Sequence, residues 1–465
     1  MTVNPLLVRE VRRILRGRAF PYSLLAILTA LSLPALIANP GLGSAGDGRS
    51  VFGSLLPIYA FYAWLIVPFY GVRWVWEERR DDTWDILSLT SLGCGSMLFG
   101  RLAAGLGLLG LMLACFAPFV SFAYLLRGLD VQLVLLSVVV VVAIAVVLLL
   151  VGIFLSTLAT HRMVWAGTAT AFLGGLAVLY GGFLDVFERA MRRGRLPDDL
   201  VAFVLGAAIP AAIVVAVATR ARLAPSASDY AFPPRVAVVA AIALWLAATL
   251  AISSSPWGAP SLLILDPQIW SIPALSLTTC LGLAAAGEPE VLSRRIRRDP
   301  RRWRSPLLAL FRTGSGRGFG LAVLLAAGIG TIHVVATEPG ARADRLLLVP
   351  ILAAYVAACL GTTLFLSRFL PERVRTPALL RLGPFVLAAI LGAIGGLRYV
   401  IQPWSRRTLL ATDLLSPIYL GPKLKRASDG DLSPEGAALL VVFVAAVAVA
   451  VNAPFVWRSI REATR

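Results

Sequence analysis

The most densely charged stretch of the sequence is residues 77–85, where seven of nine side chains are charged. The seven are Glu77, Glu78, Arg79, Arg80, Asp81, Asp82 and Asp85. On a helix that starts near residue 77, Trp84 and Leu87 lie on one stripe, and Glu78 and Asp85 lie on a neighbouring one. Such a helix offers an apolar knob with a carboxylate rim, which suits docking on a partner protein. A solvated loop helix with internal ion pairs is the alternative.

Residues that could carry catalysis or hold a metal are sparse. The four cysteines and two histidines form no CxxC motif and no Cys/His cluster. His161 and His333 lie at the ends of predicted membrane spans, with no carboxylate or cysteine at a motif spacing. The sequence therefore predicts no catalytic, cofactor-binding or metal site, and we do not expect the chain to be an enzyme.

A nucleotide-binding loop is also missing from the sequence. Its only lysines are Lys423 and Lys425, and neither follows a glycine, as the lysine of a Walker A loop does. The Gly-rich stretches 174–182 and 392–396 are not followed by Gly-Lys-Ser or Gly-Lys-Thr, and they suit helix packing better. If the protein uses ATP, we expect another chain to bind the ATP and its Mg²⁺.

The elements that position the charged stretch are predicted to be membrane helices. The mean hydropathy is +0.82, only 15% of the residues are charged, and apolar runs of about 20 residues recur. Only helices carry backbone amides economically through hydrocarbon, so the predicted fold is an all-α polytopic membrane protein. About twelve spans are expected, near 19–39, 51–72, 99–125, 131–158, 163–184, 200–219, 236–253, 268–286, 318–337, 346–367, 382–401 and 436–457.

An amphipathic helix is expected before the first span. In residues 4–20, Leu6, Leu7, Val11, Ile14 and Leu15 share one helical face, whereas Arg9, Arg12, Arg13 and Arg16 lie largely off it. This pattern is typical of a helix that lies in the membrane interface. A signal peptide is the alternative, but no small-residue cleavage motif follows the apolar run at Ala38, which favours retention.

The distribution of basic residues predicts the orientation. The chain carries a net charge of +18, and 29 of its 43 Lys and Arg residues fall in or beside the segments that are cytoplasmic if the N-terminus is inside. An orientation signal explains this bias better than nucleic-acid binding does. Both termini and the loop 77–98 are therefore expected in the cytoplasm. Two basic outer segments, 185–199 and 402–435, run against the trend.

The stretch EERRDDTWDILSLTSLGCGSMLFGRL (77–102) resembles the first cytoplasmic loop of ABC-2-type transporter permeases. The matching positions are Glu78 and Asp85 for the two acids, Thr83 and Thr90 for the two threonines, Ile86 with Leu87 for the apolar pair, and Gly100 with Arg101 for Gly-Lys. Asp82 and Ser91 stand where the family often has Gly and Pro. With the amphipathic N-terminus, Pro118 and the RGLD at 127–130, the resemblance covers residues 4 to about 220.

The resemblance implies that the loop docks on a separate ABC ATP-binding subunit. Glu78, Thr83, Trp84, Asp85 and Leu87 would form this coupling interface, with Glu78 and Asp85 as rim charges and Trp84 and Leu87 as the knob. The absence of acidic residues or lysine from the middle of any predicted span also disfavours a proton- or sodium-coupled transporter.

Two domains are expected, at 1–222 and 223–465. The first is the six-span ABC-2-type permease domain. The second is either a degenerate permease half, with the arginine-rich loop 288–318 as its coupling loop, or an accessory membrane domain whose arginines contact anionic lipids. Both interpretations stay open. If the two halves are equivalent, this chain could complete the transport pathway alone. If they are not, we expect it to pair with a further permease chain, the same or different.

The expected function is that of the transmembrane subunit of an ATP-driven exporter, multi-pass in the inner membrane of a bacterial cell. Its expected partners are the ATP-binding subunit and the lipid bilayer, with no nucleic acid. A non-transporting membrane scaffold or assembly factor with a permease-like fold is the alternative. The sequence does not indicate the transported substrate.

Overall fold

The structure is entirely helical over the residues that it describes. The computed structural model describes residues 5–17, 19–37, 48–80, 93–126, 128–158, 162–193, 198–224, 230–253, 267–286, 288, 306–337, 343–369, 380, 383 and 434–464. No strand occurs in these ranges. The chain divides into two compact units, Met1–Ala224 and Pro225–Arg465, so the division falls two residues from the expected domain boundary.

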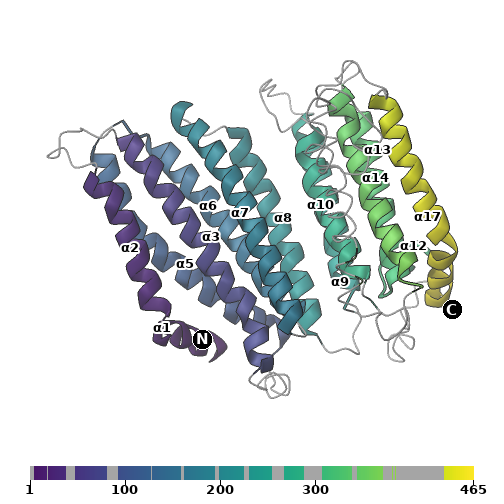
Figure 1. The fold of residues 1–465 in the computed structure, drawn as a ribbon, viewed down its shortest axis with the longest axis horizontal. Coiled ribbons are helices and arrows are strands. Elements are labelled where there is room, and N and C mark those ends of the chain that lie inside the picture. The colour runs from purple at the N-terminus through teal and green to yellow at the C-terminus, as the bar shows by residue number, and fades with distance from the viewer. Residues whose placement is uncertain are drawn as a thin grey trace, which may run out of the picture. The chain divides into compact units, whose positions relative to one another are not determined.

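Over its described residues, the first unit contains one short helix and six long ones, whose arrangement is drawn in Figure 1. They are α1 (Pro5–Arg16), α2 (Ala19–Ile37), α3 (Gly48–Arg80), α5 (Cys94–Leu125), α6 (Val131–Leu158), α7 (Arg162–Arg193) and α8 (Asp198–Leu223). The long helices form a bundle, and α1 lies across one end of it, near the start of α2.

Helix α3 is the centre of this bundle and packs most extensively against α6. Trp64 of α3 is 2% exposed, and its indole N–H donates a hydrogen bond to the Val141 carbonyl at 3.0 Å. The two helices approach closely where they carry glycine: a Cβ on Gly152 would lie 2.5 Å from the Pro68 carbonyl oxygen, and one on Gly71 would lie 3.0 Å from the Ile153 nitrogen. Small residues thus set the spacing of this pair, as is common between membrane helices.

In the part of the second unit that the structure describes, there are five long helices and one short one. They are α9 (Phe232–Ser253), α10 (Pro267–Ala286), α12 (Pro306–Ala309), α13 (Ser315–Ala336), α14 (Ala343–Leu366) and α17 (Pro434–Thr464). α14 packs against α13 and α17, and α10 packs against α13. Each long helix in both units therefore buries one side against a neighbour.

Many of these helices are suited to cross a membrane. Nine helices within the described ranges are long and apolar enough to span, and 232–247 and 271–286 are shorter apolar segments. The protein is thus multi-pass by the length and composition of its helices. Eleven of the twelve expected spans coincide with long helices. The remaining one, 382–401, lies outside the described residues apart from Gly383.

The largest difference from expectation lies at the end of α3. The predicted span ended at residue 72, with a separate loop helix starting near residue 77, but α3 runs without a break to Arg80. Arg73 and Glu77 pair across one turn of this extension at 2.6 Å. Such an i,i+4 pair supports continued helix beyond the apolar run, so Glu77 and Glu78 belong to the last turns of a spanning helix.

Candidate functional site

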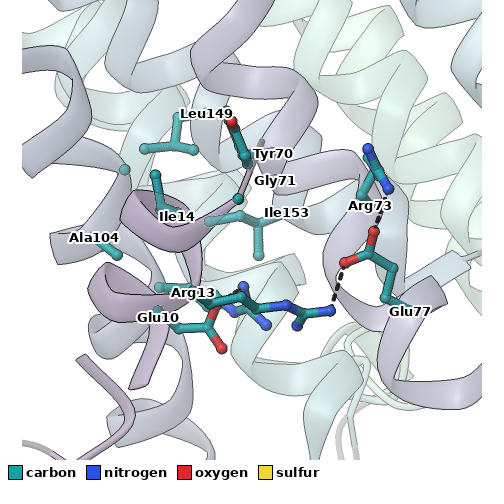
Figure 2. A pocket seen from close by; sticks show the side chains of 13 residues that line it. Glu10, Arg13, Ile14, Tyr70, Gly71, Arg73, Glu77, Ala104, Leu149 and Ile153 are labelled. Atoms are coloured by element: carbon teal, nitrogen blue, oxygen red, sulfur yellow. Dashed lines mark hydrogen bonds and ion pairs between the residues drawn. The ribbon is translucent and has the colours of Figure 1, made fainter. Parts of the chain in front are cut away.

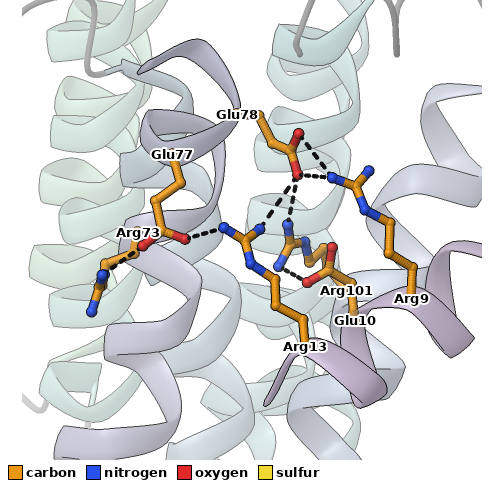
Figure 3. Close-up of polar contacts among 7 residues, drawn as sticks. All are labelled: Arg9, Glu10, Arg13, Arg73, Glu77, Glu78 and Arg101. Atoms are coloured by element: carbon orange, nitrogen blue, oxygen red, sulfur yellow. Dashed lines mark hydrogen bonds and ion pairs between the residues drawn. The ribbon is translucent and has the colours of Figure 1, made fainter. Parts of the chain in front are cut away.

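The charged groups at the ends of α1, α3 and α5 form one connected cluster, which we call the α1 clamp: Arg9, Glu10, Arg13, Arg73, Glu77, Glu78 and Arg101 (Figure 3). Glu78 is its centre. The Oε1 atom of Glu78 lies 3.1 Å from Arg9 Nη2, 3.4 Å from Arg101 Nη2 and 3.6 Å from Arg13 Nη1. One buried carboxylate therefore joins arginines from two other segments of the chain.

Two further carboxylates complete the clamp. Glu10 pairs with Arg101, and Glu77 accepts a hydrogen bond from Arg13 Nη2 at 2.9 Å. Arg101 is also held over the ring of Trp74, with its guanidinium carbon 4.8 Å from the ring centroid. Arg101 is thus fixed by two carboxylates and an aromatic face, a combination that suits the planar guanidinium.

The burial of these groups differs, and this decides their importance. The side chains of Glu10 and Glu78 are each 2% exposed and that of Arg101 is 14% exposed, whereas Arg9 and Arg13 are 47% and 40% exposed. Buried carboxylates that lose their partner cost far more free energy than exposed ones. Glu10, Glu78 and Arg101 are therefore the structural centre of the clamp, and Arg9 and Arg13 cover it.

The local sequence explains why α1 sits over this site. Leu6, Glu10 and Ile14 recur every four residues, so they share the face of α1 that points inward. The opposite face carries Val8 and Leu15, which are 43% and 53% exposed. α1 thus turns a mixed polar and apolar face inward and exposes apolar side chains, with Arg12 and Arg16 beside them, on its outer face.

Burial also affects the acidity of the Glu10 carboxyl. Desolvation raises the pKa of its carboxyl above the ordinary value of 4.5, against the opposing effect of Arg101, Arg13 and Arg9. The clamp holds four arginines and three carboxylates. Protonation of Glu10 therefore increases a positive charge that the clamp already carries.

A cavity of about 330 Å³ opens beside the clamp (Figure 2). Its charged side is formed by Glu10, Arg13, Arg73, Glu77 and Arg101, with the hydroxyl-bearing ring of Tyr70. Its apolar side is formed by Ile14, Ala104, Leu149 and Ile153, with three glycines. Four helices, α1, α3, α5 and α6, contribute to this one site.

No protein-family model, curated protein or solved structure matches this chain.

The structure places few of the predicted coupling residues. Glu78 is in the clamp, but Thr83, Trp84, Asp85 and Leu87 lie outside the described residues. Glu78 is buried and paired within the chain, so the expectation that it is an exposed rim charge is wrong. Its carboxylate is enclosed because α1 lies over the end of α3.

The predicted interface arginines divide between two faces of α1. Arg9 and Arg13 point to the clamp, whereas Arg12 and Arg16 lie beside the exposed apolar residues of the outer face. Glu10 and Arg73 were not among the residues predicted from the sequence, and Arg101 was predicted only as part of the family pattern. The signal for Glu10 was available: it is the one acidic residue among the arginines of an amphipathic helix.

The second unit holds a different buried ion pair. Arg235 of α9, which is 1% exposed, pairs with Glu288 at 2.5 Å. Arg235 also donates to the carbonyl of Leu310 at 2.6 Å, and the backbone N–H of Gly314 donates to Glu288 at 2.9 Å. These bonds fix the chain before α13 against the start of α9.

No metal site accompanies these clusters. Within the ranges that the structure describes, no group of three or more His, Cys, Asp or Glu side chains is placed to hold a metal ion. What both clusters can do chemically is fix the ends of helices to one another.

Proposed function

We propose that this protein is the transmembrane permease subunit of an ATP-driven ABC-2-type exporter, driven by a separate ATP-binding subunit that docks on the segment after α3. ATP and Mg²⁺ are bound by that subunit. The proposal includes a bacterial inner membrane as the location, about twelve spans, and cytoplasmic N- and C-termini. The order of matching residues from Glu78 to Arg101 is its basis in the sequence.

The observation that supports it most is the α1 clamp. The segment 81–92 begins where α3 ends and is followed, after Gly93, by the start of α5 at Cys94. Glu78, three residues before that segment, and Arg101, in the second turn of α5, are both tied to α1 and to each other. A force on segment 81–92 is thus delivered to three helices at once, which is what a permease needs if its energy comes from another chain.

The clamp changes the role that we propose for one of the predicted coupling residues, Glu78. Trp84 and Leu87 keep the proposed role of an apolar knob, and Asp85 and Thr83 keep theirs at its edge. Glu78 instead holds the base from which this knob projects, because it is buried beneath α1.

The second unit supports the interpretation of 223–465 as a second permease half. In the first unit, Glu78 at the end of α3 binds an arginine that precedes α2 and an arginine near the start of α5. In the second unit, Glu288 just after α10 binds Arg235 in the first turn of α9 and the backbone before α13. A carboxylate in the last turn of the second long helix (Glu78) or just after it (Glu288) plays the same part in both units, although the third partner differs.

Co-purification of the ATP-binding subunit tests the proposal. The candidate partner is a protein with a Walker A loop and an ABC signature motif, encoded beside this chain and expressed with it. Trp84→Ala removes a buried anchor worth about 2 kcal/mol, which corresponds to about a thirtyfold loss of affinity. Trp457→Ala is the matched control, because Trp457 is 58% exposed on α17.

The outcomes separate the two functional classes. Loss of the partner from Trp84→Ala membranes, with equal amounts of chain and an unaffected Trp457→Ala control, is the expected result. If the ATP-binding protein does not co-purify with the wild-type chain, the scaffold or assembly-factor alternative is favoured. Retention of the partner by both variants would show that Trp84 is not part of the interface.

A further inference from the structure

The cavity beside the α1 clamp has two chemically different sides. In Figure 2 the apolar side chains of Ile14, Leu149 and Ile153 line the cavity away from the ion pairs of Arg13, Glu77 and Arg73. A ligand that fills the cavity must therefore be charged or polar at one end and apolar at the other.

The charge of the cavity selects an anion. Among the side chains that the structure describes here, the clamp contains four guanidinium groups and three carboxylates, so positive charge is in excess by one even when every carboxylate is ionised. Arg13 and Arg73 are 40% and 51% exposed, so part of each guanidinium faces the surroundings. A guanidinium has five N–H donors in a planar fork, a geometry that matches two oxygens of a phosphate. Arg13 and Arg73 can thus stay paired with Glu77 and still donate hydrogen bonds to an anion.

The position of the cavity matches the level of lipid head groups. Charged residues of the clamp mark the ends of the apolar spans α3 and α5, and Leu149 and Ile153 lie in the last turns of span α6. The outer face of α1, with Val8 and Leu15 exposed, lies at the same end of the bundle. An amphipathic helix rests where acyl chains meet head groups, so the cavity opens at the depth of lipid phosphates.

The apolar side of the cavity has room for the start of one chain. Ala104 lines it with Ile14 and Ile153, whereas the lining glycines Gly71 and Gly105 are packed closely against Ile153 and Leu149 of α6. The volume of about 330 Å³ is at the lower end of small-molecule sites. It accommodates a head group and the first part of one acyl chain, with the rest of the lipid in the bilayer.

We propose that this cavity is a binding site for an anionic phospholipid, whose phosphate lies at Arg13 and Arg73 and whose acyl chain begins against Ile14, Ala104 and Ile153. The lipid bridges α1 to α3 and α6 at the base of the segment 81–92. The site goes beyond the proposed transport function and does not depend on it, because it rests on the cavity, its charge and its position at the ends of the spans.

Native mass spectrometry of the full-length chain in detergent tests the site. The delipidated protein is titrated with phosphatidylglycerol or with phosphatidylcholine of the same acyl chains, and the dissociation constant of the first bound lipid is measured. We expect phosphatidylglycerol to bind about tenfold or more tightly, because the choline cation of phosphatidylcholine cancels the negative charge that its phosphate brings to a site with excess positive charge. Equal binding of the two lipids would overturn the proposal.

Two variants probe the two sides of the cavity. Arg73→Gln removes a charge from the head-group side and is expected to reduce the preference for phosphatidylglycerol about tenfold. Its control is Arg192→Gln, which breaks a similar i,i+4 pair on α7, where Arg192 is 77% exposed. Ala104→Leu fills the apolar side and is expected to weaken phosphatidylglycerol binding without changing any charge. Its control is Gly174→Leu, at a position with no neighbouring atom within 4 Å of an added Cβ.

The remaining arms identify the source of the anion. Inorganic phosphate should compete with phosphatidylglycerol only weakly, because it has no chain to place against Ile14. Competition by phosphate at equal concentration would mean that the cavity binds free anions and would overturn the lipid assignment. Wild-type binding by both Arg73→Gln and Ala104→Leu would show that the lipid binds elsewhere. ATPase co-purification, measured on the same variants, reports separately on the proposed transport function.

Discussion

Replacing Glu78 by Gln tests the α1 clamp most directly. The substitution keeps the size of the side chain and removes the negative charge that Arg9, Arg101 and Arg13 share at 3.1, 3.4 and 3.6 Å. The three arginines are then left to repel one another near a buried amide. We expect α1 to detach from the bundle more often, while the long helices stay packed.

The burial of the partners sets the magnitude. Removing one partner of a fully buried ion pair costs about 3–5 kcal/mol. Arg9 and Arg13 are 47% and 40% exposed, so hydration by water compensates for much of the ion pairing with Glu78 that they lose. Arg101 is only 14% exposed, but it retains its ion pair with Glu10. The expected cost is therefore about 2 kcal/mol, which corresponds to about a thirtyfold increase in the opening constant of α1.

Hydrogen exchange of the backbone amides in residues 5–17 measures this opening. Peptides from this region of Glu78→Gln should exchange about thirtyfold faster than wild type in lipid nanodiscs, because local opening controls their protection. Glu188→Gln is the control, because Glu188 is 65% exposed and pairs with Arg192 one turn further along α7. Unchanged exchange in Glu78→Gln, or an equal change in Glu188→Gln, would refute the assignment of Glu78 as the centre of the clamp.

A double-mutant cycle separates the ion pair from general disruption. Arg101→Gln alone should also loosen α1, because it leaves Glu10 and Glu78 buried with less compensation. Glu78→Gln combined with Arg101→Gln should cost less than the sum of the two single changes, since fewer uncompensated buried charges remain. Strict additivity would show that the two side chains do not interact.

Three further predictions follow from single features of the structure. Gly152→Ala should lower the free energy of unfolding by about 1–3 kcal/mol in a denaturant titration, because the new Cβ would lie 2.5 Å from the Pro68 carbonyl oxygen; Gly174→Ala, in open space, should not. Burial raises the pKa of Glu10 above 4.5, so the folded state keeps the proton of this carboxyl over a pH range in which the unfolded state has already lost it. The contribution of Glu10 to stability is thus complete below that pH and is lost as pH rises through the higher folded value; Glu10→Gln should remove this part of the pH dependence of hydrogen exchange in 5–17, corrected for intrinsic rates. In intact cells a membrane-impermeant thiol reagent should reach Cys94 only after permeabilisation, with Cys94→Ser as the control; labelling from outside would contradict the proposed orientation.

The sequence predicts the helices well because the membrane environment makes their pattern simple. A run of about 20 apolar residues has only one economical conformation in hydrocarbon, so α6 occupies 131–158 as expected. The ends of helices are harder to predict, because helix can continue into water where charges support it. α3 continues to Arg80 in this way, through the pair of Arg73 and Glu77.

The packing of the helices could not be predicted from hydropathy. Gly71 and Gly152 are ordinary glycines in apolar runs, and nothing in their neighbours shows that they face one another across α3 and α6. The same holds for Trp64, whose hydrogen bond to the Val141 carbonyl joins residues 77 positions apart. Such pairs depend on the rotation of each helix about its axis, which a mean hydropathy does not contain.

The charged residues of the α1 clamp could be found in the sequence, but their burial and pairing could not be predicted, for a physical reason. A run of charged residues is usually solvated, so the stretch from Glu77 gave no sign that one carboxylate is buried. Glu78 becomes buried because Arg9, which lies 69 positions earlier in the chain, brings α1 over it. Conversely, α1 can press an acidic residue, Glu10, toward the bundle only because Arg101 meets it there. Each buried charge is thus tolerable only in the presence of the others, so the cluster has to form as a unit, and α1, α3 and α5 are expected to move as one body at this end of the protein.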